Sequence, residues 1–209
     1  MPQGILFLIS APSGAGKTSL VNALLDASGN ELASGLCVSI SHTTRPKRPG
    51  EEDGKNYHFV SITRFQQMQT EHAFLESAEV FGNHYGTSKS WVKQRLADGQ
   101  DVILEIDWQG ASQVHALLPE SVGIFILPPS LQALRERLTN RGQDDAQVIE
   151  TRMSEAVNEI SHFEQADFIV INENFGTALE DLKAVIRSAR LSIKHQVKSN
   201  SDLLNKLIS

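Results

Sequence analysis

A glycine-rich turn that ends in a lysine and a threonine is the stretch of this chain best suited to bind phosphate. It runs from Ser10 to Thr18 and joins the apolar run Ile5–Ile9 to a helical pattern. In such a turn, successive backbone N–H groups wrap phosphate oxygens. Lys17 would reach the terminal phosphates of a nucleoside triphosphate, and the Thr18 hydroxyl would bind magnesium. The residues expected to contact the nucleotide are Ala11, Pro12, Ser13, Gly14, Ala15, Gly16, Lys17 and Thr18.

Ala11 stands where the usual form of this loop has its first glycine. A glycine- and serine-rich turn without a ligand is therefore the alternative interpretation. The Gly-Lys-Thr ending at the start of a helix argues against a bare turn. The alanine then predicts only that the backbone at this position needs no glycine-specific angles.

A basic loop, residues 44–50, is the second candidate for anion binding. Arg45 and Arg48 lie three residues apart, and Pro46 and Pro49 stiffen the backbone beside them. Guanidinium groups bind phosphate through two parallel hydrogen bonds, and a stiff backbone loses less entropy when they do. A solvated charged loop is the alternative for this stretch alone. Together with the first loop, it predicts phosphoryl transfer between two phosphate-bearing substrates.

Short apolar runs alternate with amphipathic helical patterns along most of the chain. This alternation predicts a parallel sheet covered by helices on both faces. Core-facing stripes are expected on helices near 145–160 and 176–195, the second with Ile193 in its stripe. The apolar runs are Ile5–Ile9, Leu36–Ile40, Val102–Ile106, Val122–Leu127 and Phe168–Ile171.

Three regions depart from this alternation. Residues 41–100 hold short strand-like pieces around a helix near 62–72, which predicts an inserted mixed subdomain. Residues 139–145 form a polar loop between two helices, where ligands are often handled. The C-terminal residues include Leu203, Leu204, Leu207 and Ile208 in a polar setting, and they predict a short amphipathic helix that docks on the body or on a second subunit.

Composition narrows the class of protein. The 209 residues carry a net charge of −6, which argues against nucleic acid as the main partner. No apolar run approaches the roughly 18 residues of a membrane span, so we expect no membrane partner. The single cysteine, Cys37, cannot form an internal disulfide. We interpret it as a buried reduced thiol and expect a cytoplasmic location.

Five motifs in order resemble those of the guanylate kinase family, over residues 4–190. After the phosphate loop come Val38–Glu51 with Gly54–Val60, then Phe74–Glu79, Gly82–Thr87 and Glu105–Gly110. The resemblance implies a P-loop three-layer α/β fold with a central parallel sheet, an inserted mixed α/β acceptor-binding subdomain and a helical lid. It also implies transfer of the terminal phosphoryl group of ATP to GMP with Mg²⁺, with dGMP as a further candidate acceptor.

The same resemblance divides the chain into functional parts. The expected core comprises residues 1–40, 89–138 and 158–198. The expected GMP-binding subdomain is 41–88, the lid is 139–157 and a C-terminal tail is 199–209. The tail is where a homo-oligomer contact is expected.

Residue roles follow from the motif positions. Ser41, Arg45, Arg48, Tyr57 and Tyr85 match the positions that hold the GMP phosphate. All five side chains can donate hydrogen bonds to an anion.

Glu76 and Thr87 match the residues that read guanine. Guanine presents two adjacent donors that one carboxylate accepts together. Adenine lacks this pair and would leave Glu76 underpaired.

The remaining roles concern charge at the reacting groups. Glu105 matches an aspartate of the family that helps to bind guanine, and Asp107 matches a position near the magnesium ion. Arg141 and Arg152 match the lid arginines, which would act in catalysis with Lys17 and Arg48. Asn172 matches a position near the adenine of ATP, whereas Arg137 is interpreted as a helix-surface charge.

Two alternatives stay open from the sequence. One is a nucleoside monophosphate kinase with another base preference, against which Glu76 and Thr87 argue. The other is a non-catalytic phosphopeptide-binding module of the same fold. Because such modules typically lack the ATP loop, the presence of Lys17 and Thr18 argues against that reading.

Overall fold

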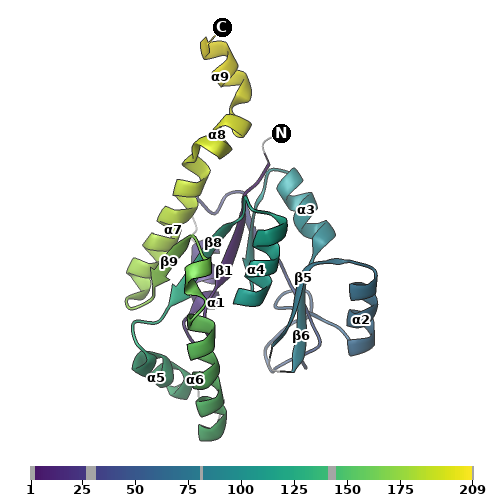
Figure 1. Ribbon diagram of the computed structural model, residues 1–209, viewed down its shortest axis with the longest axis vertical. Helices are drawn as coiled ribbons and strands as arrows, with labels where there is room; N and C mark the ends of the chain where they lie inside the picture. Colours follow the sequence, from purple (N-terminus) through teal and green to yellow (C-terminus); the bar gives the residue numbers. More distant parts are fainter. Residues whose placement is uncertain (1–2, 27–31, 81, 141–144, 209) are drawn as a thin grey trace.

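A computed structural model describes residues 3–26, 32–80, 82–140 and 145–208. Its centre is a parallel sheet in which the strands are ordered β2-β7-β1-β8-β9 (Figure 1). The strands are β1 (Leu6–Ser10), β2 (Leu36–Val38), β7 (Asp101–Glu105), β8 (Val122–Leu127) and β9 (Phe168–Ile171). Each coincides with one of the apolar runs, so the predicted parallel sheet is confirmed.

Helices cover both faces of this sheet. On one face Phe7 and Ile9 pack against α1 (Lys17–Leu25) and α7 (Phe175–Leu191). On the other face Leu6 and Leu8 pack against α3 (Lys89–Ala97) and α4 (Trp108–Leu117). Alternate side chains of a strand point to opposite faces, and both sets are apolar here. The three-layer arrangement is therefore confirmed.

A second, mixed sheet lies beside the first. Its strands β3 (His42–Thr43), β4 (His58–Phe59), β5 (Phe74–Val80) and β6 (Asn83–Ser88) are ordered β4-β3-β6-β5. Helix α2 (Ile62–Thr70) packs on this sheet, where Phe65 stacks on Phe74 with ring centroids 4.6 Å apart. The sheet joins the core partly through contacts of β5 with α3 and α4. The mixed insertion is confirmed, and its boundaries at 41 and 88 stay a prediction.

Two further helices pack against each other in an apolar cluster of their own. They are α5 (Leu131–Asn140) and α6 (Ala146–Ile160), followed by the short 3₁₀ helix η1 (Phe163–Gln165). A two-bonded ion pair between Arg135 and Glu150 links them at the surface. The cluster consists of Leu134, Leu138, Ile149, Met153 and Ala156.

The C-terminal region differs in part from expectation. The helix expected over 176–195 ends at Leu191, because Ser192 is extended (ψ 143°) and its hydroxyl accepts the His195 N–H to begin α8 (Ile193–Ser199). The prediction that Ile193 faces the core is wrong, since this residue is 84% exposed. Helix α9 (Ser201–Ile208) follows, and both short helices project from the body at the end opposite α5 and α6 (Figure 1).

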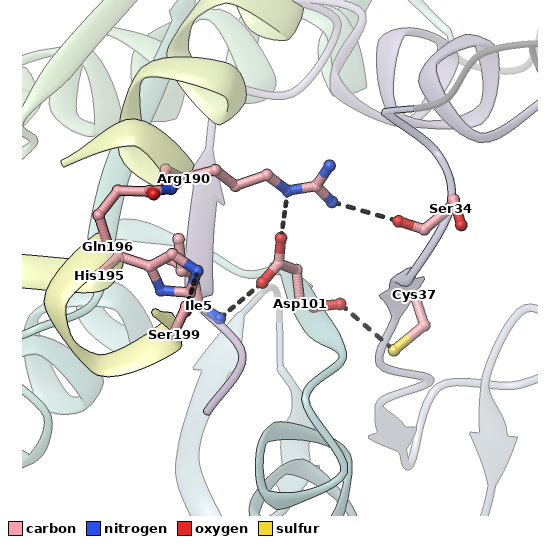
Figure 2. Close-up of polar contacts among 8 residues, drawn as sticks. All are labelled: Ile5, Ser34, Cys37, Asp101, Arg190, His195, Gln196 and Ser199. Atoms are coloured by element: carbon pink, nitrogen blue, oxygen red, sulfur yellow. Dashed lines mark hydrogen bonds and ion pairs between the residues drawn. The ribbon is translucent and has the colours of Figure 1, made fainter. Parts of the chain in front are cut away.

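A buried carboxylate anchors the end of α7 to the sheet (Figure 2). Asp101 accepts the backbone N–H of Ile5 at 2.7 Å and the Nε–H of Arg190 at 2.6 Å. The Asp101 carbonyl also accepts the Cys37 thiol at 3.5 Å. One side chain thereby joins the start of β1, β7 and α7. Across the described ranges, no helix is both long and apolar enough to cross a membrane.

Candidate active site

The phosphate loop lies between the carboxyl end of β1 and the first turn of α1. Gly14 (φ 94°) and Gly16 (φ 96°) adopt left-handed backbone angles that only glycine takes readily. A Cβ on Gly16 would also lie 2.5 Å from Nδ2 of Asn172. Ala11 is absent from the described residues with positive φ, and its side chain packs against the core. The prediction that this position needs no glycine is confirmed.

A hydrogen-bond network supports the loop from the side of β9 and α5. The Asn172 side chain, which is buried, donates from Nδ2 to the Ala15 carbonyl at 2.7 Å. Arg137 donates to the Asn172 carbonyl at 2.7 Å and to the Ala15 carbonyl at 3.4 Å. The interpretation of Arg137 as a surface charge is therefore wrong, because α5 places it near the buried Leu134 and Leu138. Asn172 lies under the loop, where it fixes the backbone.

Lys17 and Thr18 extend across the sheet toward the end of β7. The Lys17 ammonium donates to the Ile106 carbonyl at 3.2 Å, and the Thr18 hydroxyl donates to Oε2 of Glu105 at 2.8 Å. The parallel pairing of β1 with β7 sets Ile9 opposite Glu105, so both strands end at this site. Brought together in this way, Thr18 and Glu105 supply two hard oxygen donors of the type that Mg²⁺ prefers.

Glu105 and Asp107 lie in different surroundings, and their expected ligand contacts stay a prediction. Asp107 begins α4 by accepting the Gly110 N–H at 2.9 Å, and Glu105 contacts Thr18. A Cβ added to Gly110 would lie 2.8 Å from Glu76 and 3.2 Å from Asp107. The carboxylates of Glu76 and Asp107 therefore both lie close to this glycine. Asp107 therefore lies beside Glu76, and Glu105 lies beside the phosphate loop.

The two residues expected to read guanine are buried between β5, β6 and α4. Glu76 is 5% exposed and Thr87 is fully buried. Their strands pair antiparallel with these two residues opposite each other, and the Thr87 hydroxyl donates to Glu76 at 2.5 Å. Burial raises the pKa of the Glu76 carboxyl to about 7; the bond from Thr87 lowers the pKa and nearby Asp107 raises it.

The basic loop is followed by an acidic residue, Glu51, that binds Arg45 and for which the sequence motifs predicted no role. Glu51 accepts the Arg45 guanidinium at 2.6 Å and the Arg48 backbone N–H at 2.8 Å. The bond from Arg45 holds the pKa of Glu51 below its usual range. The Arg45 guanidinium also lies 5.3 Å from the centroid of the Tyr57 ring. The only sequence signal for Glu51 is its place three residues after Arg48.

Two aromatic phenols connect the basic loop to the rest of the site. The rings of Tyr57 and Tyr85 lie with centroids 5.9 Å apart in an edge-on arrangement. Burial raises the pKa of Tyr57, followed by the charges of Tyr85 and Glu105. Ser41 lies one residue before β3, where its carbonyl accepts the His58 N–H.

The structure describes only one of the two expected lid arginines. Arg141 lies outside the described residues. Arg152 lies half-buried on α6. The same helix carries Glu159, whose carboxylate accepts the Ser13 N–H of the phosphate loop at 3.1 Å. Sequence reasoning missed Glu159, because one glutamate on an amphipathic helix carries no distinguishing signal.

The fold and this site define a P-loop phosphotransferase, with a triphosphate loop at one strand end and a second anion-binding sheet beside it. A family model described as guanylate kinase matches residues 3–189. The chain belongs to the guanylate kinase family.

Individual relatives agree over their whole lengths. A guanylate kinase from Saccharophagus degradans is 54% identical over 208 residues, which cover 100% of this chain and 99% of the relative. One from Pseudomonas syringae pv. syringae is 55% identical, covering 99% and 98%. A crystal structure of guanylate kinase from Anaplasma phagocytophilum is 30% identical with a TM-score of 0.76, covering 92% of this chain and 89% of that one. Neither alternative function is favoured.

Proposed function

We propose that this chain transfers the terminal phosphoryl group of ATP to GMP, giving ADP and GDP. The observation that carries the base assignment is the buried, hydrogen-bonded pair of Glu76 and Thr87. A buried carboxylate that lacks two adjacent donors from its ligand is left underpaired, so this site selects guanine over adenine. dGMP is the further acceptor to test.

The donor half is the phosphate loop. Backbone N–H groups of the loop Ala11–Thr18, other than at Pro12, cradle the ATP phosphates, and the Lys17 ammonium neutralises charge at the transferred group. Thr18 and Glu105 would hold Mg²⁺, with Asp107 acting through water. The described residues contain no cluster of three or more histidine, cysteine, aspartate or glutamate side chains suited to a metal. Two protein oxygens with substrate phosphates are the arrangement that magnesium commonly adopts. Bound there, magnesium would neutralise phosphate charge during transfer.

The acceptor half is the second sheet with the basic loop. Arg45, Arg48, Ser41, Tyr57 and Tyr85 donate hydrogen bonds to the GMP phosphate. Glu51 binds and orients the Arg45 guanidinium in the structure. The GMP phosphate would replace the Glu51 carboxylate at a guanidinium that is already oriented. Such preorganisation lowers the entropy lost on binding.

The catalytic contribution comes from positive charge. Phosphoryl transfer spreads negative charge over the migrating group, so Lys17, Arg48, Arg141 and Arg152 act by stabilising that charge. A GMP phosphate oxygen is already an anionic nucleophile, so the reaction needs no histidine base.

A coupled assay of ADP formation tests the proposal. ATP is supplied with GMP, dGMP, AMP, dTMP and UMP in turn, and turnover with GMP is expected to exceed turnover with AMP by at least about 10⁴-fold. Absence of turnover with every acceptor would refute the enzyme assignment. A preference for AMP would refute the role of Glu76.

We further propose that the C-terminal helix α9 pairs with its copy in a second chain. Leu207 is 71% exposed and Ile208 is 85% exposed. An antiparallel pair of α9 helices centred on Leu204 would set Asp202 of each copy against Lys206 of the other, so the surface is complementary to itself. Leu203→Ser with Leu207→Ser should lower the mass measured by sedimentation, whereas Asn205→Ser on the same helix should not. An unchanged mass in the leucine variant would refute the pairing.

The location proposed for the chain is the cytoplasm. Cys37 is half-buried, and burial raises the pKa of its thiol, so it reacts poorly as a thiolate. An unreactive, unpaired thiol fits a reducing compartment.

A further inference from the structure

Three charged residues of α6 share the helix face that looks toward the phosphate loop. Arg152, Glu155 and Glu159 follow one another at spacings of three and four, which places them on one side of the helix. Of these three, Glu159 contacts the phosphate loop directly: its Oε2 accepts the Ser13 N–H at 3.1 Å in a part-buried contact. Helix α6, most of which falls in the expected lid, is thus bonded through its last turn to the loop that would hold ATP.

The chain just after α6 is held by a separate contact. His162 stacks on Trp108, with ring centroids 3.4 Å apart and planes 9° from parallel. Trp108 is the first residue of α4, so this contact belongs to the core. The loop contact of Glu159 can therefore break while the stack keeps the end of α6 in place.

The charges around the Glu159 carboxylate come from three elements. Lys17 of α1 attracts it, whereas Asp107 before α4 and Glu155 on α6 repel it. Burial is the largest influence on its pKa and raises it, while the bond from Ser13 and the charge of Lys17 lower it. Burial raises the pKa of Glu155, and the charge of Arg152 acts in the opposite direction. An ionised Glu159 is thus tolerated here mainly through groups of the phosphate loop.

We propose that Glu159 is a positioning residue that occupies the phosphate loop in place of an anion and is displaced when ATP phosphates enter, so that loop occupancy releases α6. The inference rests on the proposed ATP site. A triphosphate draws on the same positive loop, namely Lys17 and the backbone N–H groups. Two anions cannot share those donors without repulsion, so the carboxylate moves away from the loop. This movement couples ATP binding to the position of α6.

A plain structural brace makes the opposite prediction. If the bond from Ser13 only shapes the loop, weakening it would loosen ATP binding. If the carboxylate competes with phosphate, removing its charge would tighten binding. The sign of the change in affinity therefore separates the two roles.

The test is the affinity of the Glu159→Gln variant for a non-hydrolysable ATP analogue, measured by calorimetry without GMP. Glutamine keeps the length of the side chain and still accepts the Ser13 N–H through its carbonyl. We expect the analogue to bind about three- to tenfold more tightly than to the wild type. In the wild type, affinity should also fall as pH falls, because burial raises the pKa of Glu159 in the free protein and displacement relieves that burial, so that binding releases a proton. This pH component should vanish in the variant.

The matched control is Glu164→Gln, which removes the same charge from an exposed position five residues further on. It should leave the affinity and its pH dependence at wild-type values. Equal or weaker binding by Glu159→Gln, with an unchanged pH profile, would overturn the displacement proposal while leaving the ATP site intact. Failure of the wild type to bind the analogue would instead overturn the donor-site assignment and the displacement proposal together. Thermal unfolding of each variant verifies that the folded proteins are compared.

Discussion

Glu76 lies against α4 with 5% of its surface exposed, and its carboxyl pKa is raised to about 7 mainly by burial. Near neutral pH the free protein therefore holds this group partly protonated. Guanine presents donors, so it requires the ionised carboxylate. The same burial that makes the site selective thus makes binding depend on pH.

We predict that GMP binding weakens as pH falls below about 7, by about tenfold per unit once the group is mostly protonated. The carboxyl must lose its proton before it accepts guanine, so binding releases a proton. Calorimetric titration between pH 5.5 and 8.5 measures the change. In Glu76→Gln this pH component should disappear, whereas exposed Glu79→Gln should retain it. An identical pH profile in Glu76→Gln and the wild type would contradict the assignment.

The raised pKa of Glu76 also predicts a change in stability. Its folded value of about 7 exceeds the ordinary 4.5, so the stabilisation is fully present below pH 4.5 and is lost as pH rises through 7. Glu76→Gln should therefore raise the free energy of unfolding above pH 8 by up to about 3 kcal/mol, and by little at pH 4. Urea unfolding at the two pH values measures this difference. A variant that is less stable than the wild type at pH 8 would show that the ionised carboxylate is compensated better than burial indicates.

A third prediction at this scale separates the two substrate sites. Lys17→Met should lower kcat by about 10³-fold or more, because it removes a charge from the transferred group. GMP binding should be largely unchanged, since Lys17 lies at the end of the phosphate loop and contacts Ile106. Steady-state kinetics and a GMP titration measure the two effects. If GMP binding vanished too, the division into two sites would be wrong.

Some site residues could be predicted from the sequence, and others could not. Motif order located Glu76 and Thr87, because their types and spacing suit guanine. It did not show that Glu105 and Asp107 lie in different surroundings, because residues two apart at a strand end can serve different ligands once Asp107 begins a helix. Arg137 and Glu159 were missed because their partners lie in distant segments. Contacts of that range depend on tertiary packing.

At the scale of elements, hydrophobic pattern predicted the core strands closely. Residues of β1 and β8 are apolar on both faces and largely buried, as expected for strands of a covered parallel sheet. The pattern failed at the end of α7, where Ile193 continues the helical stripe but Ser192 ends the helix. A serine cap depends on a local side-chain hydrogen bond, which the spacing of apolar residues does not reveal.

The anchor of α7 predicts a defect in stability without a defect in catalysis. Asp101→Asn should lower the free energy of unfolding by about 2–4 kcal/mol, because it leaves Arg190 without its charged partner in a part-buried site. The site lies at the amino end of β7, away from Glu105 at its carboxyl end, so kcat should stay within about twofold. Exposed Arg187→Gln on the same helix is the control. Wild-type stability in Asp101→Asn would mean that the network of Figure 2 contributes little.

At the scale of the whole molecule, the charges needed for transfer lie on separate parts. Lys17 belongs to the core, Arg45 to the second sheet and Arg152 to a helix pair with its own apolar cluster. Figure 1 shows the helix pair α5–α6 and the second sheet extending from different sides of the core. A lid arginine and an acceptor arginine can flank one migrating phosphoryl group only if these parts approach each other. We therefore propose that this arrangement is an open form that closes on its substrates.

We predict that the radius of gyration falls when an ATP analogue and GMP bind together, and falls less with either alone. The reason is that each ligand supplies negative charge to one half of the site, and only the pair gives the arginines of both halves a shared target. Small-angle scattering measures the change, best on the Leu203→Ser, Leu207→Ser background so that assembly does not alter the signal. Replacing GMP with AMP is the control, because Glu76 rejects adenine and the decrease should be smaller. An unchanged radius of gyration with both ligands bound would contradict closure. It would mean that the lid and the acceptor sheet already lie close enough for their arginines to contact one phosphoryl group.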